Sequence, residues 1–167
     1  MKLLKIMRFK KGGKNLLDKL KGIIKNDEHN KINDKYILIP QKDINKALRR
    51  KITELEKIGD ESSEVLQRKY EKAFELRGKR NLRVWVCRDI DGDEIKGLTS
   101  EKCLEKEYRS QIVIDYDSPN TDDDFYAETI DLWYCFGGYS EGSGTLYDLS
   151  KNELKTDIEE TLKTLLR

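Results

Sequence analysis

Acidic side chains are the residues of this sequence whose types and spacing come closest to a catalytic pattern. Asp115 and Asp117 alternate within a segment that reads as a strand, so both carboxylates would lie on one face. Glu94-Ile-Lys96 adds the acid-x-lysine fragment seen in many nucleases, although such fragments arise often in a sequence that is 39% charged. A metal-dependent nuclease is therefore one hypothesis, in which Mg²⁺ would be held with the help of Asp122, Asp123, Asp124, Glu128 or Asp131.

Other catalytic patterns are missing from the sequence. It has a single histidine, His29, and no serine-hydrolase, zinc-protease or phosphate-loop motif. Its three cysteines (Cys87, Cys103 and Cys135) show no CxxC spacing, which argues against a zinc site and a disulfide framework and fits a reducing cytoplasm. We therefore expect a non-enzymatic protein without a resident metal or cofactor.

The charge of the chain is strongly asymmetric. Residues 1–83 hold 24 lysines and arginines against 12 aspartates and glutamates, whereas residues 84–167 hold 9 against 20. The basic half makes nucleic-acid binding an alternative function, through phosphate contacts by Lys10, Lys11, Lys14, Arg77, Lys79 and Arg80. The last three of these residues also suit the C-terminus of a helix, where cations complement the helix dipole. Contact with a membrane surface is not expected, because the basic N-terminal segment has no tryptophan and Phe9 as its sole aromatic residue.

Two strand-like segments repeat one pattern, Trp85-Val-Cys87 and Trp133-Tyr-Cys135. In each, the apolar alternates face one way and the tryptophan and cysteine face the other. If both strands belong to one sheet, its second face carries two tryptophans and must be covered by the N-terminal helix, another subunit or a partner. The leading hypothesis is a protein–protein interface with an unidentified partner, and its predicted contact residues are Trp85, Trp133, Tyr139, Asp122, Asp123 and Asp124.

Helices are predicted in three places by apolar residues at spacings of three and four. Residues 1–35 form a basic helical segment followed by a loop, and residues 36–167 form a single domain. Within that domain, residues 41–78 predict an αα-hairpin, with Gly59 and Asp60 at the turn and Gly78 at the end. Residues 151–166 predict a C-terminal helix that a Ser150–Glu153 capping box begins.

Residues 82–149 change to a two-residue period and predict an antiparallel sheet of four or five strands. Asp91-Gly92 predicts a type I′ turn, and the glycines from Gly137 to Gly144 predict the turn of a second hairpin. The expected class is therefore α+β. The sequence has neither a signal peptide nor an apolar run long enough to span a membrane, so we expect a cytoplasmic protein.

Overall fold

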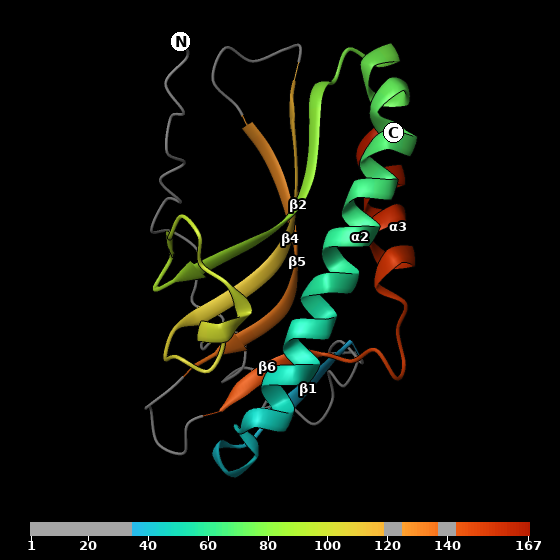
Figure 1. The fold of residues 1–167 in the computed structure, drawn as a ribbon. Coiled ribbons are helices and arrows are strands. Elements are labelled where there is room, and N and C mark those ends of the chain that lie inside the picture. The colour runs from blue at the N-terminus through green and yellow to red at the C-terminus, as the bar shows by residue number, and fades with distance from the viewer. Residues whose placement is uncertain (1–34, 119–124, 137–142) are drawn as a thin grey trace, which may run out of the picture. The chain divides into compact units, whose positions relative to one another are not determined.

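The chain divides into two units, residues 1–34 and residues 35–167. The structure, a computed structural model, describes residues 35–118, 125–136 and 143–167. The predicted N-terminal basic helix therefore lies outside the described residues. The second unit is an α+β fold, as predicted, in which two α-helices lie on one face of an antiparallel sheet (Figure 1).

The sheet has six strands, all antiparallel, in the order β1-β6-β5-β4-β2-β3. In chain order they are β1 (Tyr36–Ile39), β2 (Arg80–Ile90), β3 (Asp93–Glu94), β4 (Tyr108–Asp117), β5 (Phe125–Cys135) and β6 (Gly144–Tyr147). Four or five strands were predicted within residues 82–149, and β1 joins the sheet from outside that range. The predicted type I′ turn fits the structure, because Asp91 and Gly92 both have a positive φ, at 53° and 82°.

The helical elements are α2 (Lys46–Leu76) and α3 (Leu154–Leu166), with the 3₁₀ turns η1 (Gln41–Asp43) and η2 (Ser100–Lys102). The predicted αα-hairpin is wrong, because α2 is one continuous helix of 31 residues. Asn45 caps its start by accepting hydrogen bonds from the backbone N–H groups of Ala47 and Leu48, at 2.9 and 3.2 Å. Gly78 ends it as predicted, with a φ of 74° and the paired backbone bonds of a Schellman motif.

Gly59 was predicted to end a helix, but it lies inside α2 at a point where the helix packs closely against the sheet. A Cβ atom at this position would lie 3.0 Å from both Ile112 Cδ1 and Val86 Cγ2 and 3.4 Å from Leu132 Cδ1. The buried stripe of α2 therefore continues through residue 59 without a break. A glycine is needed here because a larger side chain would not fit between the helix and the sheet. From the sequence alone, a glycine of this kind looks the same as a glycine that ends a helix.

We expect Gly59→Leu to lower the free energy of unfolding by about 2 kcal/mol, because overpacking a core costs 1–3 kcal/mol. Leucine is the better helix former, so a position governed by helix propensity alone would gain stability instead. Urea denaturation measures the difference, with Val65→Leu on an exposed part of the same helix as the matched control. A Gly59→Leu variant as stable as this control would contradict the close packing.

The C-terminal helix begins three residues later than predicted, and no capping box forms. The Ser150 hydroxyl donates to Asp148 Oδ1 at 2.6 Å, and the Asp148 carboxylate also accepts from the Ser150 backbone N–H at 3.0 Å. Glu153 becomes the N-cap and makes no side-chain cap bond. Serine and aspartate favour such local hydrogen bonds in turns. Because the Ser150 hydroxyl is bonded to Asp148 in this turn, it does not cap the helix.

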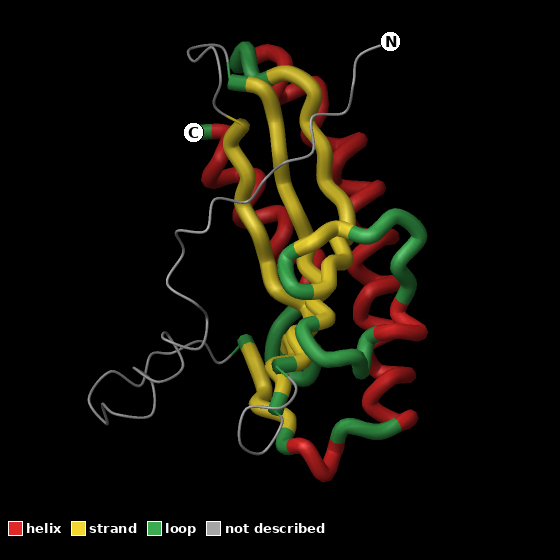
Figure 2. The backbone as a smooth tube through the Cα atoms, turned by 90° about the vertical axis from the view of Figure 1, so that its left-hand side faces the viewer, coloured by secondary structure: helices red, strands yellow, loops and turns green. Residues whose placement is uncertain are grey.

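The hydrophobic core lies between the helices and the sheet (Figure 2, where the strands lie in front of the helices). Its fully buried members come from α2, α3 and the central strands, and they include Ile52, Leu55, Leu66, Phe74, Ile112, Ile114, Leu132, Leu154, Ile158 and Leu162. Burying each side chain of this size stabilises the fold by roughly 2 kcal/mol. Within the described residues, no helix has the length and apolar character needed to cross a membrane.

Candidate functional site

A β-bulge in β5 separates the two tryptophans that were predicted to share one face. Gln111 of β4 pairs with Asp131 of β5. The residue before it in β4, Ser110, pairs with Trp133, which lies two positions after Asp131 in β5. Leu132 is therefore an extra residue, and the alternation of β5 shifts by one beyond it. Trp133 turns onto the face that α2 covers, so the prediction of a common face is wrong.

Trp133 is a core residue. Its side chain is 0% exposed, and its indole Nε1 donates to the backbone carbonyl of Cys103 at 2.7 Å. The ring packs directly against Gly144 of the neighbouring strand β6. A fully buried side chain cannot contact a partner while the protein stays folded, so its role among the described residues is structural.

Trp85 takes the opposite position. Val84 and Val86 are buried on the helix side, so Trp85 between them faces away from the helices. It is half-buried, and the guanidinium of Arg83 lies 6.0 Å from its ring centroid. Arg83 is 51% exposed and forms an ion pair with buried Asp115 on β4. Burial raises the pKa of Asp115, and this ion pair opposes the rise.

The centre of this second face differs from its margin. Gln111, Val113 and Asp115 on β4 are all buried, as is Cys87 on β2. The side chains of Arg83 and Trp85, on the outer strand β2, keep part of their surface exposed. The part of the predicted binding face that can meet a partner is therefore its margin along β2.

A hollow of about 350 Å³ adjoins this margin, between α2 and β2. Its lining consists of Asp60, Ser63, Glu64, Gln67 and Arg68 from the helix and of Val84 and Trp85 from the strand. Gln67 Oε1 accepts a hydrogen bond from the backbone N–H of Val84 at 2.8 Å. Residues 83–88 pair with β4 on one side, and among the described residues no strand pairs with their other side. β2 therefore has a free outer edge that faces this hollow.

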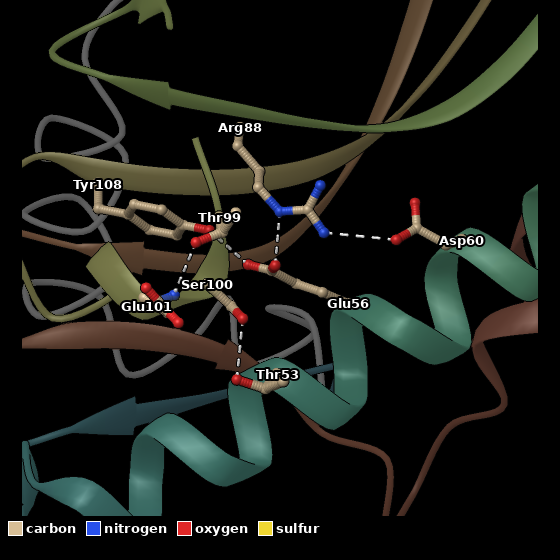
Figure 3. Close-up of polar contacts among 8 residues, drawn as sticks. All are labelled: Thr53, Glu56, Asp60, Arg88, Thr99, Ser100, Glu101 and Tyr108. Atoms are coloured by element: carbon tan, nitrogen blue, oxygen red, sulfur yellow. Dashed lines mark hydrogen bonds and ion pairs between the residues drawn. The ribbon is translucent and has the colours of Figure 1, made fainter. Parts of the chain in front are cut away.

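A buried polar network joins α2 to the sheet beside this hollow, and the sequence did not reveal it (Figure 3). Glu56 is 1% exposed and accepts from Arg88 Nε at 2.6 Å and from the Tyr108 hydroxyl at 2.7 Å. Arg88 also reaches Asp60 at 3.4 Å. Burial and the Glu56 carboxylate raise the pKa of Tyr108, so its phenol stays protonated and donates. Because both carboxylate oxygens are engaged by the protein itself, the network is structural.

One signal could have pointed to Glu56. It lies on the apolar stripe of α2, four residues after Ile52 and three before Gly59, where an acid is out of place on a helix that faces a core. Arg88 shares the helix-facing alternation of Val84 and Val86. Two opposite charges at core-facing positions of successive elements indicate a buried ion pair.

The basic cluster predicted for nucleic acid lies where α2 ends, and part of it is engaged there. Lys79 Nζ donates to the carbonyl of Leu165 in the last turn of α3 and lies 5.4 Å from the ring centroid of Tyr116. Arg77 and Arg80 are exposed. The carbonyl ends of α2 and α3 carry partial negative charge, which the cations offset and which a phosphate would meet unfavourably. Helix termination therefore accounts for Lys79, and a nucleic-acid role of Arg77 and Arg80 stays a prediction.

The charge asymmetry of the chain is used partly inside the fold. Lys35 pairs with Asp157 at 2.9 Å, Lys69 pairs with Glu159 at 2.6 Å, and Arg83 pairs with Asp115. Two hydrogen bonds lower the pKa of Glu159 to about 2, and the one from Lys69 has a larger effect than the one from Tyr70. Each pair joins the basic first half of the sequence to the acidic second half, so these charges attract within the molecule.

The acids proposed for a nuclease do not converge in the part of the chain that the structure describes. No group of three or more metal-binding side chains occurs among those residues. Asp115 pairs with Arg83, and Asp117 accepts from Asn81 at 2.5 Å. The predicted positions Tyr139, Asp122, Asp123, Asp124, Lys10, Lys11 and Lys14 lie outside the described residues.

Two of the cysteines, Cys87 and Cys103, are poor nucleophiles. Cys87, Cys103 and Cys135 are buried, and none of them forms a disulfide among the described residues. Burial raises the pKa of Cys87 to about 11 and that of Cys103 to about 12, so both thiols are protonated at neutral pH. Neither of them can supply the thiolate that cysteine catalysis needs.

Comparisons with known proteins give no family for this chain. No protein-family model, curated protein or solved structure matches it.

Proposed function

We propose that this protein is a non-enzymatic binding protein that meets a partner protein along the margin of β2, with Trp85 and Arg83 as its principal contacts. The observation that carries the proposal is the position of Trp85. It is a half-buried tryptophan on a sheet margin, turned away from both helices, with an arginine over its ring and a hollow beside it.

Tryptophan and arginine are the residue types most enriched at the energetic centres of protein interfaces. A partner that covers both would bury the indole and desolvate a guanidinium already held in place by Asp115. The pre-set orientation reduces the conformational entropy that Arg83 would lose on binding. The expected contacts therefore concentrate on Arg83 and Trp85, which lie two positions apart on β2.

The experiment is a pull-down from cells that produce the protein, with the full chain as bait and with Trp85→Ala as the test variant. We expect the captured partner to be lost from Trp85→Ala, whose fold is checked by far-ultraviolet circular dichroism and by its denaturation midpoint. The matched control is Leu76→Ala, which truncates a side chain that is also apolar and is 79% exposed on α2. If folded Trp85→Ala captures the same partner as Leu76→Ala does, the proposal is wrong.

A further inference from the structure

We infer that the partner binds as an extended segment that adds a strand to the free outer edge of β2 and displaces the Gln67 side chain from it. This inference rests on the proposed function, because it specifies how the margin of β2 is recognised. The ligand chemistry is a peptide main chain in β conformation. An antiparallel or parallel strand would make the same kind of contact with the edge.

The free edge has the length that such a segment needs. Residues 83–88 of β2 pair in unbroken register with β4 and with no other described strand, and β3 pairs only with Asp89 and Ile90. At about 3.4 Å per residue, this stretch from residue 83 to residue 88 runs for roughly 17 Å. Exposed edges of this kind are templates for strand addition unless the protein covers them.

Gln67 covers one point of the edge with a group that resembles the proposed ligand. Its carboxamide oxygen accepts from the Val84 N–H at 2.8 Å, as the carbonyl of a neighbouring strand would. Because the Val84 N–H points away from β4, the N–H of Val86 two residues later points the same way. A side-chain amide thus takes the place that a partner's backbone amide can occupy.

The lining of the hollow also suits an uncharged, polar main chain. Ser63 is 2% exposed, and its hydroxyl has no hydrogen-bond partner among the described residues. The charged side chains of the lining are paired, Glu64 with Arg68 inside the lining and Asp60 with Arg88 beside it. A lining whose charges are already paired, with one buried hydroxyl unsatisfied, complements the dipoles of a peptide backbone better than it complements a charged ligand.

The test uses a defined probe, the acetylated and amidated peptide Thr-Val-Thr-Val-Thr-Val-Thr, added to the ¹⁵N-labelled full chain. Its alternating residues favour an extended conformation without charge. We expect saturable shifts of the Val84 and Val86 backbone amides and of the Gln67 side-chain amide. The same peptide with every amide N-methylated has no main-chain donors, and we expect it to leave those signals unchanged.

Two substitutions at Gln67 separate displacement from a purely structural role. Gln67→Ala removes the competing acceptor, so the peptide should bind about threefold more tightly, as expected for one hydrogen bond. Gln67→Glu supplies a stronger, charged acceptor for the Val84 N–H, so the peptide should bind more weakly by a similar factor. Val65→Ala, on an exposed part of α2, is the matched control and should leave the affinity unchanged.

Four results would overturn the inference: no edge shifts at about 5 mM peptide, equal shifts with the N-methylated peptide, weaker binding by Gln67→Ala, or edge shifts that depend on protein concentration alone. The last would mean that a second copy occupies the edge. Failure here is distinguishable from failure of the proposed function. If partner capture depends on Trp85 while the edge stays unpaired, the margin is used but strand addition is not.

Discussion

Replacing Gly144 with alanine should lower the free energy of unfolding by about 3 kcal/mol, at the upper end of what overpacking usually costs. A Cβ atom there would overlap Cη2 of Trp133 and lie 2.5 Å from Cζ3 of the same ring and 2.7 Å from the carbonyl oxygen of Tyr134. The ring cannot swing aside freely, because its Nε1 is bonded to the carbonyl of Cys103. Urea denaturation followed by tryptophan fluorescence measures the loss.

Gly92→Ala is the matched control for this substitution. Gly92 has a positive φ of 82° and open space around a would-be Cβ, so alanine there costs only backbone strain, about 1 kcal/mol. A second test truncates the ring. In a Trp133→Leu background, Gly144→Ala should cost less than it does in the native chain, since the two residues are in contact. Equal costs in both backgrounds would show that Trp133 does not limit residue 144.

The alternation of the strands could be predicted from the sequence, but the bulge could not. Leu82, Val84 and Val86 face the helices as their two-residue period indicates, and so do Ile112 and Ile114. In β5 the same period predicts the face of Ile130 but fails at Trp133, because one inserted residue reverses every later side chain. Nothing local to the Leu132-Trp133 pair marks the insertion, which depends on the register with β4.

Close approaches between distant segments escaped prediction for a related reason. Gly59 and Gly144 each fit a turn pattern, yet each leaves room for side chains of elements far away in sequence. Gln67 shows the same limit for the candidate site. Its importance comes only from its distance to the Val84 N–H, and a glutamine on the surface of a helix carries no sign of it. Trp85 was chosen from the Trp-x-Cys pattern that it shares with Trp133, and of these two tryptophans it is the one whose side chain stays partly exposed.

Removing Glu56 from its buried network is the second substitution for which we expect a large loss of stability. Glu56→Ala removes the acceptor of both Arg88 and Tyr108, and it leaves a guanidinium whose side chain is only 22% exposed with Asp60, at 3.4 Å, as its remaining partner in the network. Removing one member of a buried ion pair costs 3–5 kcal/mol, and the partial exposure of Arg88 places the expected loss near the lower limit, at about 3 kcal/mol. Glu61→Ala, whose side chain is 67% exposed, is the control and should change stability by less than about 0.5 kcal/mol.

Replacing the whole network distinguishes the cost of an unpaired charge from the value of the pair. In the triple variant Glu56→Leu, Arg88→Met and Tyr108→Phe, no buried group loses its partner, because all three polar groups are removed together. Apolar replacement of a buried ion pair is often neutral, so the triple variant should be more stable than Glu56→Ala. Denaturation midpoints of the single and triple variants give the comparison. A triple variant that loses more than Glu56→Ala would mean that the ion pair itself contributes net stability, through its contacts between α2, β2 and β4.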